Sequence, residues 1–222
     1  RTASVFDDMV DRSVPFYEEI QRQTAELAAD FAQEGSAIVD LGCSTCASFL
    51  AIDRLLPPDL DVRYLGVDSS VAMLAKAQEK LTSAGVRRPF ELRVGDLDAG
   101  VEIADASVVR LVLTLQFVRP LRRERLLRSI REGLRDDGCL ILVEKVLGES
   151  STFNRLFIEH YYDLKRRNGY SELEISQKRE ALENVLIPYK LLENRELLLR
   201  TGFRYVDVFF KWYNFCGIVA IK

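Results

Sequence analysis

The sequence predicts an α/β protein built on a doubly wound, Rossmann-like sheet of mostly parallel strands with helices on both faces. Three observations predict it: short apolar runs recur along the chain, helical patterns lie between them, and a short link joins the last two strands. The chain has 222 residues, of which 48% are hydrophobic and 29% are charged, the balance of a folded globular protein. We expect one domain over residues 1–222, with a helical insertion at about 149–200.

Five near-continuous apolar runs predict the parallel strands. They lie at residues 37–42, 63–68, 90–96, 107–113 and 139–144. Strands of a parallel sheet are buried on both faces, so they read as continuous apolar runs rather than alternating ones. Residues 203–210 and 217–221 predict two further strands, and the link at 211–216 predicts that they form an antiparallel hairpin at one edge of the sheet.

Helical periodicity fills the segments between these runs. The predicted helices lie at residues 16–31, 71–81, 121–134, 152–167, 171–186 and 191–199. Ser69 and Ser70 are N-cap candidates for the helix at 71–81, and Gly85 is expected to end that helix. The alternation of strand and helix implies right-handed crossovers and a doubly wound sheet. The stretch 149–200 contains no convincing strand.

The charge and the rare residue types exclude several classes of protein. The net charge is −3, from 31 basic and 34 acidic residues, which argues against a protein that coats nucleic acid. His160 is the single histidine, so a histidine zinc site is nearly excluded and we expect no metal. The four cysteines are expected to be free thiols. Neither a membrane-spanning apolar run nor an export signal is visible, so we expect a cytoplasmic protein.

The turn after the first strand is the best local ligand site. Gly42 allows the backbone to approach a ligand closely, and the helix that follows offers free N–H groups. Only the first glycine of the dinucleotide fingerprint is present, with Ser44 and Cys46 at the later small positions. Taken alone, the turn also fits an ordinary strand-to-helix connection.

Acidic residues at the ends of the next two strands strengthen this signal. Asp68 is placed to accept hydrogen bonds from both ribose hydroxyls of a nucleoside. Asp96 is placed to accept from an adenine amino group, while the N–H of Leu97 meets a ring nitrogen. The three strand ends together predict nucleoside binding, and the lack of a phosphate-cradling glycine-rich loop favours S-adenosylmethionine (SAM) over ATP. A parallel sheet ending in a hairpin is also the sheet of class I SAM enzymes.

Three other features have plainer interpretations. Cys43 and Cys46 have the spacing of a redox pair, but small residues suit the turn in any case. The arginines of the helix at 121–134 form a basic stripe, which we interpret as a solvated helix face rather than an RNA contact. His160 is interpreted as a surface or partly buried side chain rather than a general base.

One block is richer in polar groups than a pair of helices requires, and it carries a resemblance. Residues 168–179 read Asn-Gly-Tyr-Ser-Glu-Leu-Glu-Ile-Ser-Gln-Lys-Arg. The chain closely resembles the bacterial carboxy-S-adenosyl-L-methionine (carboxy-SAM) synthase family over essentially its whole length. Further matches are Asp11-Arg12-Ser13-Val14-Pro15 with Tyr17, Asp40-Leu41-Gly42-Cys43-Ser44, Thr114-Leu115-Gln116-Phe117, Glu144-Lys145 and Asn214-Phe215.

The resemblance implies a homodimeric enzyme that converts SAM and prephenate into carboxy-SAM and phenylpyruvate. The product supplies a carboxymethyl group for a wobble uridine of tRNA, which a separate enzyme adds, so no direct nucleic-acid contact is implied. The residues implied to line the site of SAM or carboxy-SAM are Tyr17, Gly42, Cys43, Ser44, Asp68, Ser69, Asp96, Leu97 and Arg179. Among them, Arg179 is implied to have the catalytic role of holding the transferred carboxylate, which suits the fork of a guanidinium.

The chain departs from the family at two positions, and alternatives stay open. Cys46 replaces a glycine and Val112 replaces an asparagine, and we expect both to lie at the ligand. One alternative is other SAM chemistry on the same fold: methyl transfer to a small molecule, or SAM cleavage or cyclisation such as azetidine-2-carboxylate formation. Another is a non-catalytic binding module that has kept the fold. The second substrate is prephenate or another carboxylate.

Overall fold

The computed structural model describes the backbone of residues 2–222 and the side chains of residues 8–222. The helices are α1 Thr2–Ser13, α2 Tyr17–Phe31, α3 Ala47–Leu55, α4 Val71–Ser83, the short 3₁₀ helix η1 Leu115–Phe117, α5 Pro120–Gly133, α6 Ser151–Arg167, α7 Glu172–Leu182 and α8 Leu191–Arg200. The strands are β1 Ser36–Leu41, β2 Val62–Asp68, β3 Phe90–Val94, β4 Ala106–Val112, β5 Leu134–Leu147, β6 Tyr189–Lys190, β7 Tyr205–Trp212 and β8 Phe215–Ile221.

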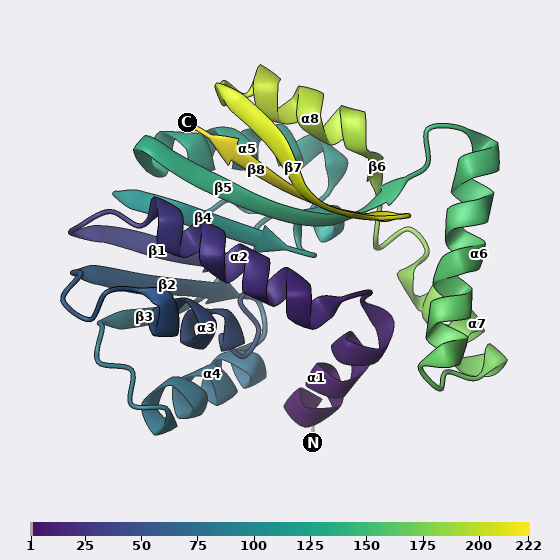
Figure 1. Ribbon diagram of the computed structural model, residues 1–222, viewed down its shortest axis with the longest axis horizontal. Helices are drawn as coiled ribbons and strands as arrows, with labels where there is room; N and C mark the ends of the chain where they lie inside the picture. The colour runs from purple at the N-terminus through teal and green to yellow at the C-terminus, as the bar shows by residue number, and fades with distance from the viewer. Residues whose placement is uncertain (1) are drawn as a thin grey trace.

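The main sheet has the strand order β3-β2-β1-β4-β5-β8-β7 (Figure 1). The strands β3 to β5 in this order run parallel, and Val39 of β1 lies opposite Leu65 of β2 on one side and Val109 of β4 on the other. β8 runs antiparallel to β5, and β7 antiparallel to β8. The structure confirms the doubly wound sheet with a C-terminal antiparallel hairpin. The chain order reverses between β1 and β4, which is where ligands bind in open α/β sheets.

Helices bury apolar side chains on both faces of the sheet. On one face, α2, α3 and α4 contribute Ala28, Phe49 and Leu81, all fully buried. On the other, α5 and α8 contribute Leu127 and Leu198. Each of the buried Phe and Leu side chains stabilises the fold by about 1.5–3 kcal/mol relative to an exposed one. The two apolar layers hold the strand ends in place, and with them the loops that follow the strands.

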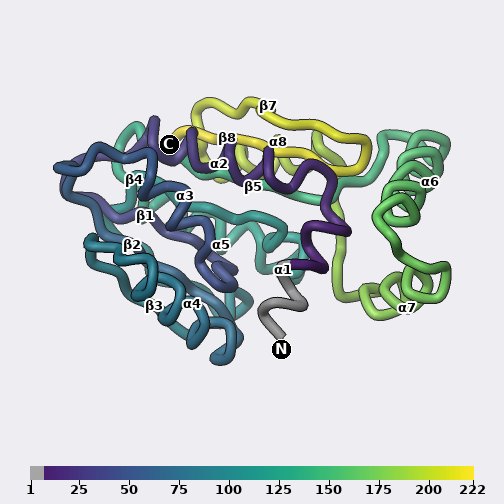
Figure 2. The backbone as a smooth tube through the Cα atoms, turned by 60° about the horizontal axis from the view of Figure 1, so that its bottom comes forward, coloured from purple at the N-terminus to yellow at the C-terminus, as the bar shows by residue number. Residues whose placement is uncertain are grey.

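The segment predicted to be a helical insertion has two parts. α6 and α7 stand to one side of the sheet, as both backbone views show (Figures 1 and 2). α8 instead packs on the sheet, with Leu197 and Leu198 in the core. Between them lies β6, which pairs with the end of β5. The expectation of no strand in this stretch is therefore wrong for Tyr189–Lys190, a strand of two residues too short to show a periodic pattern.

The bounds of β5 and α7 differ most from the predicted ones. β5 extends beyond the predicted apolar run at both ends, because Leu134 pairs with Ala106 of β4 and because Val146 and Leu147 pair with β6. α7 ends at Leu182, four residues early, and Asn184 then takes a left-handed conformation with φ of 61°. Asparagine is one of the few side chains that adopts this conformation readily.

Arg123 of α5 is a correction to the predicted solvated arginine stripe. It is buried, and its guanidinium donates to the carbonyl oxygens of Val118, Gln116 and Ile187 at 2.7–3.1 Å. It therefore connects α5 to the chain that returns from α7. No helix in the described part of the chain is long and apolar enough to cross a membrane.

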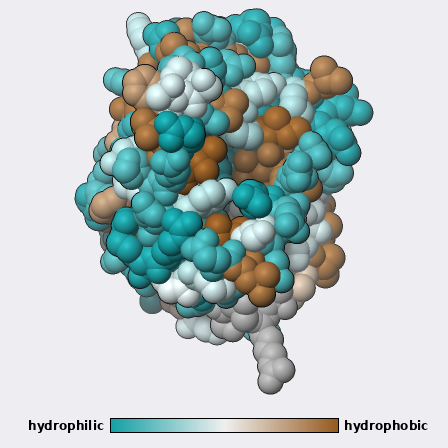
Figure 3. Space-filling model, turned by 90° about the vertical axis from the view of Figure 1, so that its right-hand side faces the viewer, coloured by the Kyte–Doolittle hydropathy of each residue, from teal (hydrophilic) through white to brown (hydrophobic). Residues whose placement is uncertain are grey.

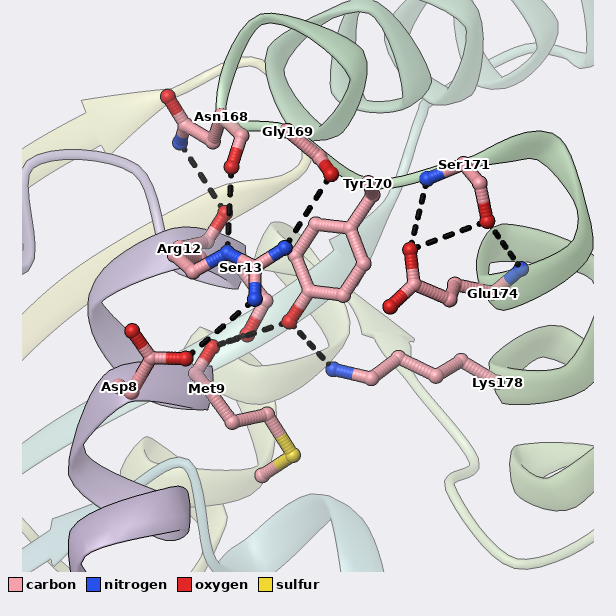
Figure 4. Close-up of polar contacts among 10 residues, drawn as sticks. All are labelled: Asp8, Met9, Arg12, Ser13, Asn168, Gly169, Tyr170, Ser171, Glu174 and Lys178. Carbon is pink, nitrogen blue, oxygen red and sulfur yellow. Dashed lines mark hydrogen bonds and ion pairs between the residues drawn. The ribbon is translucent and has the colours of Figure 1, made fainter.

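α1 contacts the junction between α6 and α7, far away in the sequence (Figure 4). The Arg12 guanidinium donates to the carbonyl oxygens of Asn168 and Gly169 at 3.2 and 3.3 Å and lies over the ring of Tyr170. The Asn168 side chain donates to the Arg12 carbonyl oxygen at 3.0 Å. These contacts place α1, α6 and α7 around one side of the cavity described next.

Candidate active site

A cavity of about 620 Å³ opens at the carboxyl ends of the parallel strands. This volume is within the range of pockets that bind small molecules. Figure 3 shows that the face carrying α6 and α7 is hollowed, with apolar side chains along the hollow. The cavity has two halves, which we call the strand-end half and the far half. The strand-end half includes Gly42, Cys43, Ser44, Asp68, Ser69, Asp96 and Leu97. The far half includes Met9, Ser13, Val112, Lys145, Tyr161, Leu182, Leu186 and Phe215.

The turn after β1 forms the floor of the strand-end half. The N–H groups of Gly42 and Cys43 donate to the Val67 carbonyl oxygen at 2.8 and 3.0 Å, which ties the turn to β2. Gly42 has φ of 74°, and a Cβ there would lie 2.4 Å from the Thr114 hydroxyl oxygen. Only glycine fits this position, because any side chain would combine a strained backbone with a clash.

Asp68 at the end of β2 is held by backbone N–H groups. One carboxylate oxygen accepts from the N–H of Ser44 and the other from the N–H of Ser70, both at 2.9 Å. Ser70 also caps α4 by accepting from the N–H of Met73. A carboxylate has about four acceptor positions, so each oxygen of Asp68 keeps one for a ligand hydroxyl. This geometry suits a ribose, whose two hydroxyls are adjacent.

The loop after β3 completes the strand-end half. The N–H of Gly95 donates to the Asp68 carbonyl oxygen at 3.0 Å, which brings the second and third strand ends together. The Asp96 carboxylate accepts from the N–H of Asp98 at 3.0 Å, and Asp96 and Leu97 both line the cavity. The predicted acidic strand ends therefore share one wall.

A buried ion pair lies between the two halves of the cavity. Arg110 of β4 donates to the Asp40 carboxylate of β1 at 2.6 Å, and both side chains are almost fully buried. Arg110 also donates to the side chains of Gln21 and Thr24 at 3.1 Å. Gln21 donates to the Tyr17 hydroxyl at 2.7 Å, and burial raises the pKa of Tyr17, which keeps it protonated. Sequence reasoning assigned no role to this pair, although a charged residue inside an apolar strand was a visible signal.

The far half combines apolar side chains with one amine, and a second amine lies near it. Lys145 of β5 lines it beside Tyr161 and Phe215, and the Lys145 backbone N–H donates to the Gln116 side chain at 2.8 Å. Burial, with a smaller contribution from the nearby charge of Lys178, lowers the pKa of Lys145 to about 8. Burial and two neighbouring lysines lower the pKa of Lys165 on α6 to about 7. Sequence reasoning assigned these lysines no role either.

The predicted site residues come together with one exception. Tyr17, Gly42, Cys43, Ser44, Asp68, Ser69, Asp96 and Leu97 all line the cavity. Arg179 lies on an exposed side of α7 and outside the lining, although Leu182, one turn later, lines the cavity. His160 also lies outside it, exposed and stacked on Tyr213 with ring centres 4.5 Å apart.

The two departures from the family pattern have different surroundings. Val112 lines the cavity. Cys46 does not: it is fully buried, and its sulfur would lie 3.1 Å from a Cβ at Gly66. Its left-handed φ of 58° turns the side chain into the core. Cys43 and Cys46 are both buried and free, and a hydrogen bond with Cys46 together with burial raises the pKa of Cys43, which disfavours its thiolate. In the described residues, no group of side chains has the composition of a metal site.

The fold and the site define a class of protein, and comparisons agree with it. Residues 38–138 match a family described as methyltransferase domain. Solved structures with the same fold include the YcgJ protein from Bacillus subtilis, at a TM-score of 0.66 and 13% identity over 92% of this chain and 98% of that one. Another is the pyocyanin biosynthetic protein PhzM, at a TM-score of 0.62 and 21% identity over 91% of this chain and 54% of that one. The fold is that of class I SAM-dependent methyltransferase-like enzymes.

Curated relatives narrow the class to one family. The chain is 58% identical to the carboxy-SAM synthase of Methylococcus capsulatus, over 99% of this chain and 90% of that one. It is 43% identical to the carboxy-SAM synthase of Desulfotalea psychrophila, over 100% of this chain and 90% of that one. This chain belongs to the carboxy-S-adenosyl-L-methionine synthase family. It is a SAM-utilising enzyme, and the resemblance found in the sequence is confirmed.

Proposed function

We propose that this enzyme forms carboxy-SAM from SAM, with prephenate as the carboxyl donor and with phenylpyruvate and water as the other products. The observation that carries the proposal is the cavity with two unlike halves. Acids and backbone groups at three strand ends suit a nucleoside, whereas the far half offers an apolar wall with an amine. A reaction that joins parts of two substrates needs both in one closed space. The names of the relatives support carboxy-SAM as the product.

The strand-end half fits SAM, residue by residue. Asp68 would bind the ribose hydroxyls, and Asp96 and Leu97 the adenine. The backbone of Gly42, with Cys43, Ser44 and Ser69, would lie against the ribose and the methionine part. Tyr17 and the buried Asp40–Arg110 pair would bind the polar end of the methionine part. The open acceptor positions on Asp68 and the space kept by Gly42 support this fit.

The chain's own residues would then position the substrates and exclude water. SAM supplies a sulfonium whose methyl group receives the carboxyl group. The walls from α1, α6 and α7 would keep the transferred group out of water. Fixed charges act more strongly on it in such a water-excluded site than they would in water. We propose that Arg179 holds the transferred carboxylate, which requires its guanidinium to turn from the surface of α7 toward the cavity. We also propose that residues 1–222 act as one domain.

We propose further that the enzyme is a homodimer and that its small-molecule product passes to a separate tRNA-modifying enzyme. Large apolar side chains of the 149–200 segment are exposed, among them Phe153, Leu173 and Val185 at 52%, 66% and 53%. An exposed apolar surface of this kind indicates an interface. Light scattering at micromolar concentration tests this, because a mass of one chain alone would contradict the dimer.

Product analysis tests the proposed reaction. The purified protein is incubated with SAM and prephenate, and nucleosides are identified by mass spectrometry. The proposal predicts carboxy-SAM and phenylpyruvate in equal amounts. S-adenosylhomocysteine would indicate methyl transfer instead, and methylthioadenosine would indicate cleavage or cyclisation of SAM. Unchanged SAM with tight binding would indicate a non-catalytic module.

A further inference from the structure

Three amines converge where β5, α6 and α7 meet, and we call Lys145, Lys165 and Lys178 the lysine cluster. The Lys145 and Lys165 nitrogens each lie 4.5 Å from the centre of the Tyr161 ring. The Lys178 nitrogen donates to the Tyr170 hydroxyl at 2.7 Å, as Figure 4 shows. Each of the three is therefore within electrostatic reach of the others, on one side of the cavity.

Nearby acids do not compensate this charge. Within the described part of the chain, the ammonium groups of Lys145 and Lys165 have no ion pair and no hydrogen bond. Glu144 precedes Lys145 on β5, so it lies on the opposite side of the strand, on the side of Arg123. Glu174 is bound to Ser171 in the cap of α7 (Figure 4). Uncompensated amines at low exposure are unfavourable in the empty protein, because a charge removed from water needs a partner.

The surroundings of the cluster define what that partner is. Lys145 and Tyr161 line the far half of the cavity with Phe215, Leu182 and Leu186. A ligand here meets one direct ammonium, further positive charge behind it and apolar walls on its other sides. This combination suits an organic carboxylate with an apolar body better than an inorganic anion, whose hydration shell the apolar walls would not replace.

We propose that the lysine cluster binds a carboxylate of the second substrate, with Lys145 as its direct ligand and Lys165 and Lys178 adding positive charge behind it. This inference rests on the proposed function, because it places the second substrate beside the nucleoside in the same cavity. The ligand class is an organic anion with an apolar body, such as a 2-oxo acid.

Calorimetry on three variants tests the assignment. Phenylpyruvate and its uncharged methyl ester are titrated separately into the SAM-saturated protein. We expect Lys145→Met to weaken phenylpyruvate binding by roughly tenfold or more, the effect of losing a hydrogen bond to a charged group. Lys165→Met should weaken it less, and Lys76→Met, an exposed control on α4, should not change it. Ester binding and SAM affinity should stay within about twofold of wild type in all variants.

The outcomes separate this inference from the proposed function. Wild-type phenylpyruvate affinity in Lys145→Met would overturn the lysine assignment even if the enzyme makes carboxy-SAM. Equal binding of the acid and the ester by the wild-type protein would overturn it too. Selective loss of acid binding supports it even if prephenate proves to be the wrong carboxyl donor. Thermal unfolding checks the fold, and Lys165→Met provides a second test if Lys145→Met does not fold.

Discussion

The two halves of the cavity are built in different ways. In the strand-end half, backbone N–H groups fix a carboxylate, as Ser44 and Ser70 fix Asp68, and the contributing loops are close in sequence. In the far half, side chains form the walls, and they come from α1, β5, α6, α7 and β8. The comparison teaches that turns directly after the strands build the strand-end half, whereas packing between segments far apart in the sequence builds the far half, where the proposed second substrate would bind.

The largest effect is expected at the ion pair between the halves. Arg110→Met leaves the Asp40 carboxylate buried without its partner, so stability should fall by about 3–5 kcal/mol. Urea unfolding measures this loss. The double variant Asp40→Asn with Arg110→Met removes both charges and should lose much less than Arg110→Met. A single variant as stable as wild type would show that the pair does not hold the halves together.

In the strand-end half, Asp68→Ala should weaken SAM binding by about 1.5–3 kcal/mol, the usual effect of losing hydrogen bonds to a charged group. Titration calorimetry measures the affinity, and Asp59→Ala, an exposed acid before the same strand, is the control. A folded Asp68→Ala protein that binds SAM normally would remove Asp68 from the site. We expect Asp68→Ala to leave the far half unchanged, so phenylpyruvate should still raise the melting temperature of the variant.

Arg179 decides whether α7 contributes more than a wall to the far half. If its guanidinium turns toward the transferred carboxylate, Arg179→Leu should weaken carboxy-SAM binding by roughly tenfold or more and leave SAM affinity within a few-fold. Arg179→Lys should restore little of the carboxy-SAM affinity, because an ammonium lacks the planar fork of a guanidinium. Equal loss for both nucleosides would contradict carboxylate recognition.

The smallest expected effect is the pH dependence of stability in the far half. In the folded protein Lys165 has a pKa of about 7, below the ordinary value of about 10.4 that it has in the unfolded chain. Between these two pH values the unfolded chain therefore binds more protons than the folded protein does. Below the folded-state pKa, the charged Lys165 destabilises the folded protein to its full extent. The free energy of unfolding should therefore rise as the pH increases through that pKa. Groups facing it are Lys145, Lys178, Tyr161 and Tyr170.

Urea unfolding of the ligand-free protein at about pH 6 and pH 8, roughly one unit on either side of that pKa, measures the slope. Lys165→Met should have a flatter slope than wild type, and the exposed control Lys76→Met should keep it. Equal slopes in wild type and Lys165→Met would show that Lys165 titrates as an ordinary exposed lysine.

The sequence predicted the sheet and the strand-end half because their signals are local. An apolar run that ends in Gly42 or Asp68 is visible without knowing the fold. The far half was not predictable in this way, since Lys145, Lys165 and Tyr161 meet only through tertiary packing. Cys46 was expected at the ligand, but its left-handed backbone turns it into the core. Side-chain direction at such positions does not follow from spacing.

Transfer of an isotope label tests the central claim that one cavity holds both substrates during the reaction. The enzyme is given SAM and prephenate that carries a heavy carbon isotope in its ring carboxylate, with unlabelled bicarbonate in excess. Mass spectrometry then measures the label in the nucleoside product. If the two halves form one closed site, nearly all of the carboxy-SAM carries the label. Unlabelled carboxy-SAM, or label found only in bicarbonate, would contradict this account.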